Sequence, residues 1–184
     1  MGDITGLLRQ AATDDRSAID ELFGLLYDDV HRMARARLGG NRSITMLETT
    51  GLAHEAYLRL RNAARIDAGS RGQFMAYVSQ VLRTIIVDFA RKRSAERRGG
   101  DNVHVAFDTD QVDSIAEADA DVEHIAEALE VLEETDPRLK QVVEMRYFGG
   151  MNDGEIAEAL GVTARTVGRD WERARLMLSV ALKR

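Results

Sequence analysis

Cysteine is absent from this sequence of 184 residues, and proline occurs only once. The lack of thiols excludes disulfide scaffolds, cysteine nucleophiles and cysteine–zinc sites. No apolar run approaches the roughly 18 residues of a membrane-spanning helix, and the first residues lack the basic and apolar segments of a secretion signal. The scarcity of proline, together with abundant Ala, Leu, Arg and Glu, predicts an all-α protein. We therefore expect a cytoplasmic, helical chain that makes no contact with a membrane.

Positive charge is outweighed overall, since the net charge is −6, but it is concentrated in two places. Residues 1–98 carry a net +4, residues 99–122 carry −7 without any Lys or Arg, and residues 123–184 carry −3. Residues 71–98 alone reach +5, and residues 165–184 reach +4. Two basic clusters on an acidic chain favour two separate contacts with anionic partners such as nucleic acid. The alternative is two solvated helix faces.

Apolar periodicity divides the first part of the chain into helices. The pattern predicts helical structure over residues 3–38 with a break near residue 14, a helix over about 45–62, and a helix over about 73–97. Residues 63–72 have the composition of a loop. These helices would form one small domain at residues 1–98.

The composition changes after residue 98. Residues 99–122 are acidic, poor in large apolar side chains and without clear periodicity, so we expect a flexible linker with at most a short helix at its end. Fully extended, this linker could span about 80 Å, roughly two turns of duplex DNA. Helical periodicity resumes at about residue 123, and Asp136 followed by Pro137 predicts the start of a further helix. The expected architecture is therefore two small helical domains, the second at 123–184, joined by an acidic linker.

Residues 153–172 have the pattern of a helix-turn-helix. That motif needs apolar residues in both helices, a small residue where the helices cross and a turn residue that tolerates positive φ. Ala157 is the small residue, Gly161 the turn residue, and Thr163 can cap the second helix with its hydroxyl. The apolar positions are Ile156, Leu160, Val162 and Val167. An αα-hairpin with a charged outer face is the alternative.

The second helix of this motif has two different faces. Val167, Trp171 and Ala174 lie on an apolar stripe, which favours a core position for the only Trp over a base-stacking role. A recognition helix would place its other face in the major groove, where arginine binds guanine bidentately or holds phosphate. The residues expected to contact DNA are Arg165, Thr166, Arg169, Arg173 and Arg175.

Three segments, in this order, resemble parts of a bacterial RNA polymerase sigma factor of the extracytoplasmic-function (group IV) type. Residues 52–60 (LAHEAYLRL) resemble the helix by which that group binds core polymerase. Residues 73–93 resemble the helix that reads the minus-ten promoter element. Residues 135–176 resemble domain four, which reads the minus-thirty-five element. The resemblance covers nearly the whole chain and implies sigma domain two at 1–98 and sigma domain four at 123–184.

The resemblance implies a subunit that binds core RNA polymerase and directs promoter-specific transcription initiation, without being an enzyme itself. Its implied partners are core polymerase and promoter DNA, together with an anti-sigma protein that could mask residues 48–60. The implied polymerase contacts are Glu48, Leu52, Glu55, Leu58 and Arg59. The 62–72 loop, with Asn62, Arg65 and Arg71, would hold an unstacked base of the minus-ten element. The residues that would follow the DNA backbone nearby are Arg83, Arg91, Lys92, Arg93 and Arg97.

The sequence departs from that family pattern before the polymerase-binding helix. Many members of the group have a cluster of Asp and Glu there, whereas this chain has Glu48, Thr49, Thr50 and Gly51. One explanation is drift, with Glu48 and Glu55 sufficient for docking. The other is that a Ser/Thr protein kinase supplies the missing charge, since a phosphothreonine adds about −1.5 to −2. The helix dipole would favour that charge, and arginines of the polymerase could bind it. Thr50 is the preferred site and Thr49 the second choice.

Other chemistry is not indicated. No two histidines have metal-ligand spacing, the glycine pairs do not form a phosphate loop, and no serine has the context of a nucleophile, so we expect no metal, no cofactor and no catalysis. Two other functions stay open. One is a stand-alone dimeric helix-turn-helix regulator that binds palindromic DNA without polymerase. The other is an interaction module whose basic helices meet acidic proteins. The basic cluster at residues 91–98, which has no role in a simple regulator, and the acidic linker favour the sigma factor.

Overall fold

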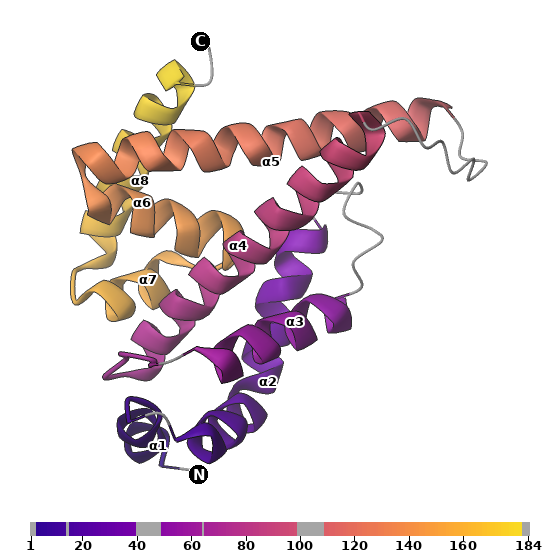
Figure 1. Cartoon of the computed structure of the whole chain (residues 1–184). Helices are drawn as coiled ribbons and strands as arrows, with labels where there is room; N and C mark the ends of the chain where they lie inside the picture. The colour runs from indigo at the N-terminus through magenta and orange to yellow at the C-terminus, as the bar shows by residue number, and fades with distance from the viewer. Residues whose placement is uncertain (1–2, 14, 40–48, 64, 99–108, 182–184) are drawn as a thin grey trace.

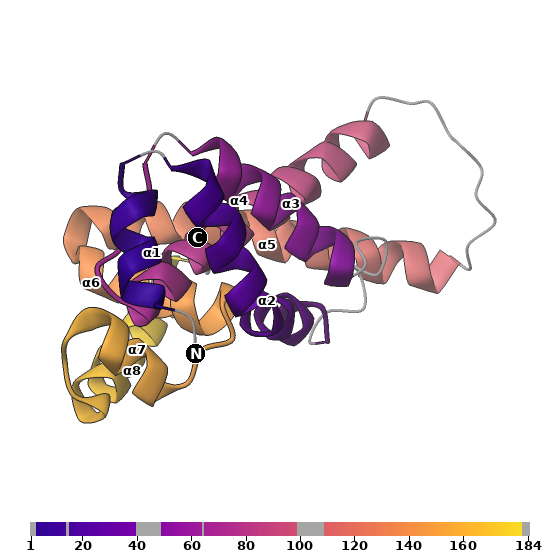
Figure 2. The same ribbon diagram turned by 90° about the horizontal axis from the view of Figure 1, so that it is seen from below.

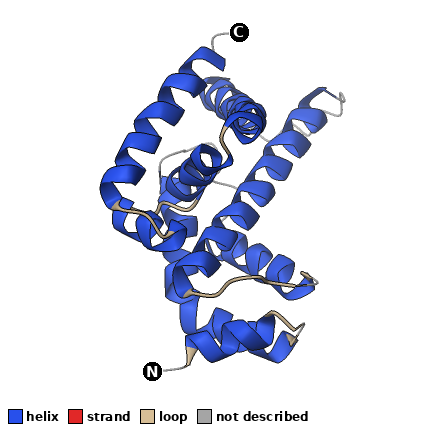
Figure 3. Cartoon of the chain, turned by 90° about the vertical axis from the view of Figure 1, so that its left-hand side faces the viewer, coloured by secondary structure: helices blue, strands red, loops and turns tan. Residues whose placement is uncertain are grey.

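The computed structural model describes residues 3–13, 15–39, 49–63, 65–98 and 109–181, and their regular elements are helices (Figure 3). The elements in chain order are α1 (Ile4–Ala11), α2 (Arg16–Gly39), α3 (Thr49–Asn62), α4 (Arg71–Arg98), α5 (Thr109–Thr135), α6 (Pro137–Val143), the π-helical turn η2 (Glu144–Phe148), α7 (Asp153–Leu160) and α8 (Ala164–Ala181). The prediction of an all-α chain is thereby confirmed.

Helix α4 lies at the centre of the arrangement. It runs diagonally through Figure 1, with α2 and α3 on one side and α5, η2 and α7 on the other. Both α4 and α5 extend toward the same side of the molecule, as the view from below also shows (Figure 2). Helix α8 packs against α5, α6 and α7.

The apolar side chains form one continuous core. The buried members include Leu22 of α2, Leu52 of α3, Phe74 and Leu82 of α4, and Phe148 of η2. Because the same cluster contains residues from both sides of the 99–108 segment, the two expected domains share a core in this structure.

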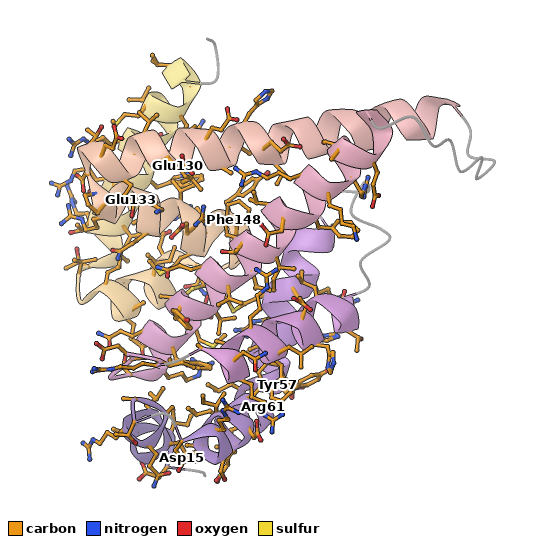
Figure 4. All side chains as sticks on the ribbon, viewed as in Figure 1. Asp15, Tyr57, Arg61, Glu130, Glu133 and Phe148 are labelled. Atoms are coloured by element: carbon orange, nitrogen blue, oxygen red, sulfur yellow. The ribbon has the colours of Figure 1, made fainter. Side chains whose placement is uncertain are left out.

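Helix α3 is held against α2 by polar contacts as well. The Tyr57 hydroxyl donates a hydrogen bond to Asp20 Oδ1 at 2.9 Å, and Arg61 Nε lies 3.2 Å from the same oxygen. Figure 4 shows Tyr57 and Arg61 side by side at the surface of this helix pair.

The predicted linker differs most from the structure. Helix α5 begins at Thr109, so the second half of the 99–122 segment is helical, and the expected boundary at 123 falls inside a helix. Two causes account for the difference. Neither Gly nor Pro interrupts residues 109–135, and docking on α4 stabilises a helix whose own periodicity is weak.

The other expected boundaries agree within a few residues. The helix predicted over 73–97 extends from Arg71 to Arg98, which shortens the preceding loop. The helix predicted from about residue 45 begins at Thr49, and residues 40–48 lie outside the described part of the chain. The predicted break near residue 14 separates α1 from α2.

Two glycines of the last two helices provide a matched stability test. Gly161 has φ +66°, with open space around it, so Gly161→Ala should cost about 1–2 kcal/mol of unfolding free energy through backbone strain alone. Gly168 lies inside α8, and a Cβ there would meet its nearest atom at 3.9 Å. Gly168→Ala should therefore stabilise the chain by about 0.5–1 kcal/mol. Urea unfolding of both variants checks the opposite signs. Equal urea midpoints for the two variants would contradict the left-handed backbone conformation of Gly161.

Candidate nucleic-acid interface

The helix-turn-helix is built from local caps. The Asn152 side chain accepts hydrogen bonds from the backbone N–H groups of Gly154 and Glu155 at 3.0 Å, and the Glu155 carboxylate accepts one from Asn152 N at 2.9 Å. This reciprocal pair starts α7, and the left-handed residue Gly161 ends it. Thr163 Oγ1 accepts a hydrogen bond from Thr166 N at 3.2 Å and so caps α8, as predicted.

The inner face of α8 is fixed by packing and by a buried charge. Val167 and Ala174 are buried, and Trp171 is half-buried beneath the guanidinium of Arg146, 4.6 Å from the ring centroid. The Asp170 carboxylate is buried and accepts two hydrogen bonds from Arg138, at 2.8 and 3.4 Å. These contacts set the orientation of α8 relative to α6 and leave its opposite face exposed.

The five α8 residues predicted to contact DNA differ in their availability. Arg165 and Arg169 are exposed, and no described residue pairs with either side chain. The hydroxyl of Thr166 lies 2.9 Å from that of Thr163. The Arg173 guanidinium lies 3.3 Å from Asp136, and that of Arg175 lies 3.3 Å from Glu172. Ion pairs this exposed contribute little to stability and can exchange for a phosphate contact.

The C-terminal end of α4 is a second basic surface. Arg91 is exposed, Lys92 lies 4.0 Å from Glu96, and the guanidinium of Arg93 lies 5.5 Å from the centre of the Phe89 ring. The side chain of Arg97 lies outside the described part of the structure. The end of α4 therefore brings together Arg91, Lys92 and Arg93, three of the residues that were predicted to follow the DNA backbone.

The other predicted minus-ten residues are not part of this surface. Arg83 points toward η2, and its Nε lies 2.9 Å from Glu144 Oε1. Arg71 pairs with Asp29 of α2 at 2.5 Å. Arg65 is exposed, 3.7 Å from Asp67, and Asn62 is exposed at the end of α3. Sequence reasoning could not identify Glu144 and Asp29 as partners because each is far from its arginine along the chain.

The predicted polymerase-binding face on α3 needs one correction. Leu52 is completely buried in the core and cannot contact a partner. Leu52 is apolar because it packs in the core. The sequence pattern alone does not distinguish a core residue from a residue that docks on a partner. Leu58 remains exposed, whereas Arg59 lies 3.1 Å from Glu55 and 3.0 Å from Asp88.

The start of α3 holds the predicted modification sites. Thr49 is half-buried at the first position of the helix, and Thr50 is exposed beside it. Thr50, His54 and Leu58 are spaced by four and therefore share a face of α3. Glu48 lies outside the described residues.

Burial dominates the electrostatics of Glu144. Desolvation raises the pKa of its carboxyl group, while the positive charges of Arg83 and Lys140 oppose that rise and the nearby Glu133 adds to it. The carboxylate is 3% exposed, and the guanidinium of Arg83 is 23% exposed. This ion pair is thus an enclosed charge contact between α4 and η2.

The described part of the chain contains neither a membrane-spanning helix nor a cluster of metal ligands. None of the helices there is both long and apolar enough to cross a membrane. Nor do three or more His, Asp or Glu side chains among those residues form a group that could hold a metal ion.

Comparison with known proteins identifies the class. The model of the ECF sigma factor family matches residues 1–184. The chain therefore belongs to the ECF sigma factor family, whose members associate with core RNA polymerase and promoter DNA to direct promoter-specific transcription. Anti-sigma factors are frequent partners of this family.

Individual relatives share about a quarter to a third of their residues with this chain. The chain is 30% identical over 176 residues to the ECF RNA polymerase sigma factor SigK of Mycobacterium ulcerans (strain Agy99), a match that covers 90% of this chain and 86% of the relative. It is 26% identical over 175 residues to the proteins of the same name from Mycobacterium tuberculosis (strain H37Rv) and Mycobacterium bovis (strain BCG / Pasteur 1173P2), with the same coverage.

The raised pKa of Glu144 predicts a pH dependence of stability. The folded chain binds this proton more tightly than the unfolded chain, whose Glu pKa lies near 4.5. The contribution of Glu144 to stability should therefore grow as the pH falls through the raised pKa and be lost as the pH rises through it. We expect the unfolding free energy of wild type minus that of Glu144→Gln to increase between pH 7.5 and pH 5. The same difference for Glu133→Gln should stay nearly constant over this range and decrease only below about pH 4.5, because Lys140 lowers the pKa of Glu133. A flat difference for Glu144 would contradict its burial.

Proposed function

We propose that this sigma factor reads the minus-thirty-five element with α8, reads the minus-ten element with α4 and the loop before it, and docks on core polymerase through α3. The observation that most supports this proposal is the capped helix-turn-helix, whose second helix presents Arg165 and Arg169 without a partner among the described residues. Sigma domain two would comprise residues 1–98 and sigma domain four residues 123–184, joined by the acidic segment at residues 99–122.

At the minus-thirty-five element, α8 enters the major groove with its N-terminal half. Arg165 and Arg169 bind base edges or phosphates there, and the Thr166 hydroxyl adds a shorter contact. Arg173 and Arg175 lie further along the helix, where they reach the DNA backbone after leaving their surface partners.

At the minus-ten element, residues 91–93 and Arg97 follow the DNA backbone at the end of α4. Asn62, Arg65 and Arg71 flank the loop in which an unstacked base of the opened strand is held. Arg83 joins this set only after it separates from Glu144.

The polymerase contact lies on the exposed side of α3. Leu58 supplies an apolar contact, with Glu48, Glu55 and Arg59 around it, and an anti-sigma protein would compete for the same face. Leu52 supports this face from beneath by packing in the core.

Phosphorylation of Thr50 by a Ser/Thr protein kinase would strengthen that contact. Thr50 is exposed in the first turn of α3, where the helix dipole favours negative charge, and it shares a face with Leu58. A phosphate there offers three acceptor oxygens to basic residues of the polymerase. Thr49 is the second choice because its side chain is half-buried.

The DNA contacts of α8 can be tested with single alanine variants. Arg165→Ala and Arg169→Ala should each cost about 1–3 kcal/mol of promoter binding, which is roughly 5- to 150-fold in affinity, because each removes a base or phosphate contact. Binding is measured with holoenzyme on a promoter duplex selected from a randomised library by the wild-type holoenzyme. Arg9→Ala, which removes an exposed arginine of α1, is the control for net charge. If both α8 variants bind the promoter as tightly as Arg9→Ala does, the proposal that this face of α8 contacts DNA is refuted.

Phosphorylation is tested by titrating core RNA polymerase with wild type, Thr50→Ala, Thr50→Glu and a kinase-treated wild-type sample. We expect the treated sample to bind more tightly than untreated wild type, Thr50→Glu to recover part of the gain, and Thr50→Ala to abolish the effect of the kinase. Thr49→Ala is the matched control and should respond like wild type. Equal binding by all samples would exclude activation at Thr50 while leaving the sigma-factor function intact.

A further inference from the structure

Two charge pairs join the start of α6 to α8. Arg138 donates hydrogen bonds to the Asp170 carboxylate from Nε at 2.8 Å and from Nη2 at 3.4 Å. Two residues earlier, Asp136 accepts a hydrogen bond from Arg173 Nη1 at 3.3 Å. Asp136 also caps α6, because its Oδ1 accepts the backbone N–H of Arg138 at 3.2 Å. The start of α6 is therefore fixed against one edge of α8.

The two pairs expose their arginines and cover their carboxylates. The side chain of Asp170 is 4% exposed, whereas that of Arg138 is 43% exposed. In the second pair Asp136 is half-buried and Arg173 is exposed. Each pair has no net formal charge, but the guanidinium is the part that reaches the surface. This edge of the helix-turn-helix therefore presents positive charge to an anionic partner.

The exposed part of Arg138 lies on the side of α8 that is proposed to bind DNA. Asp170 comes four residues after Thr166 and three residues before Arg173, so these three positions share one edge of α8. Because Arg138 is bonded to Asp170, its guanidinium lies beside that edge. A recognition helix in the major groove has the DNA backbone along its edges, where contacts are made to phosphates.

Arg138 has a nitrogen left for such a contact. Asp170 engages Nε and Nη2, and none of the described residues pairs with Nη1. A guanidinium has five N–H donors in a fixed plane, so it can bind a carboxylate and a phosphate at the same time. The buried carboxylate holds Arg138 in one orientation. Binding to DNA therefore costs this side chain less conformational entropy than it would cost a free arginine.

We infer that Arg138 is a further promoter contact, which binds a phosphate beside the minus-thirty-five element, and that Asp170 is the residue that positions it. In the complex, Nη1 donates a hydrogen bond to a phosphate oxygen while Nε and Nη2 stay on Asp170. The inference rests on the proposed function, because it requires that α8 lies in the major groove. It adds to that function a DNA contact from outside α8.

A neutral pair of similar shape separates this role from a structural one. Arg138→Gln/Asp170→Asn replaces the ion pair by two amides that can hydrogen-bond to each other, and it leaves the net charge unchanged. Lys140→Gln/Glu133→Gln is the matched control, since it neutralises an ion pair between α6 and α5 that is not proposed to contact DNA. Urea unfolding checks that both variants are folded. Binding of each holoenzyme to the selected promoter is measured from about 50 to about 200 mM salt.

We expect the neutral pair to bind the promoter roughly tenfold more weakly than wild type at low salt, because a charge-assisted hydrogen bond is lost. The slope of log affinity against log salt should become less steep by about 0.9, the value of one phosphate contact. The control pair should match wild type in both. Wild-type affinity, or a loss of affinity with an unchanged slope, would overturn the inference.

Neutral phosphates locate the contact on the DNA. In a promoter series in which single phosphates are replaced by methylphosphonates, one replacement beside the minus-thirty-five element should weaken wild type but leave the affinity of the neutral pair unchanged. A purely structural role of Arg138 would instead leave the variant as sensitive as wild type at every phosphate, and this result would overturn the inference.

Failure of this inference can be told from failure of the proposed function. If Arg165→Ala and Arg169→Ala lose affinity while Arg138→Gln/Asp170→Asn does not, only the contact by Arg138 is wrong. If wild-type holoenzyme selects no promoter, the proposed function fails, and the inference fails with it.

DNA cleavage keeps the inference testable if the neutral pair does not fold. The chain has no cysteine, so Thr135→Cys, at an exposed position three residues before Arg138, can carry a single iron chelate that cleaves nearby DNA backbone. We expect cleavage at the edge of the minus-thirty-five element in the holoenzyme complex. A complex that protects the promoter but shows no cleavage from this position would overturn the inference.

Discussion

Burial of helix α4 on both sides is the constraint on which the rest of this structure depends. A helix with polar residues at its ends is stable at this length only when its apolar positions are covered, and those of α4 are covered by α2 and α3 on one side and by α5, η2 and α7 on the other. The same helix carries basic residues that we propose bind promoter DNA. Arg83, one of these residues, is paired with Glu144 of η2 in this structure.

Two buried carboxylates, those of Asp170 and Glu144, form the enclosed ion pairs that hold helices of this fold together. Asp170 lies inside the helix-turn-helix and accepts two hydrogen bonds from Arg138, so it fixes α8 against α6. Glu144 lies between α4 and η2 and is paired with Arg83, so its environment depends on how the two parts of the chain are arranged. Exposed pairs such as Arg175–Glu172 contribute little in comparison and leave their arginines available to phosphate.

An acidic protein can bind DNA when its positive charge is placed at the ends of helices that the fold presents. This requirement is met by Arg165 and Arg169 of α8, which pair with no described residue, and by the exposed Arg91 of α4, although the net charge of the chain is −6. Other arginines, among them Arg83 and Arg138, form ion pairs within the protein. Two such surfaces in one chain fit the proposed reading of two promoter elements.

Local chemistry in the sequence by itself determined the all-helical class, the ends of most helices and the helix-turn-helix. The chain-local reasons are a left-handed turn at Gly161 and a hydroxyl cap at Thr163, which act over a few residues and can therefore be recognised from spacing. Tertiary packing decided the rest. It stabilised α5 from Thr109, buried Leu52 and paired Arg83 with Glu144, a residue 61 positions later in the numbering. Burial and pairing depend on which segments meet in space, and no local pattern of residues contains that information.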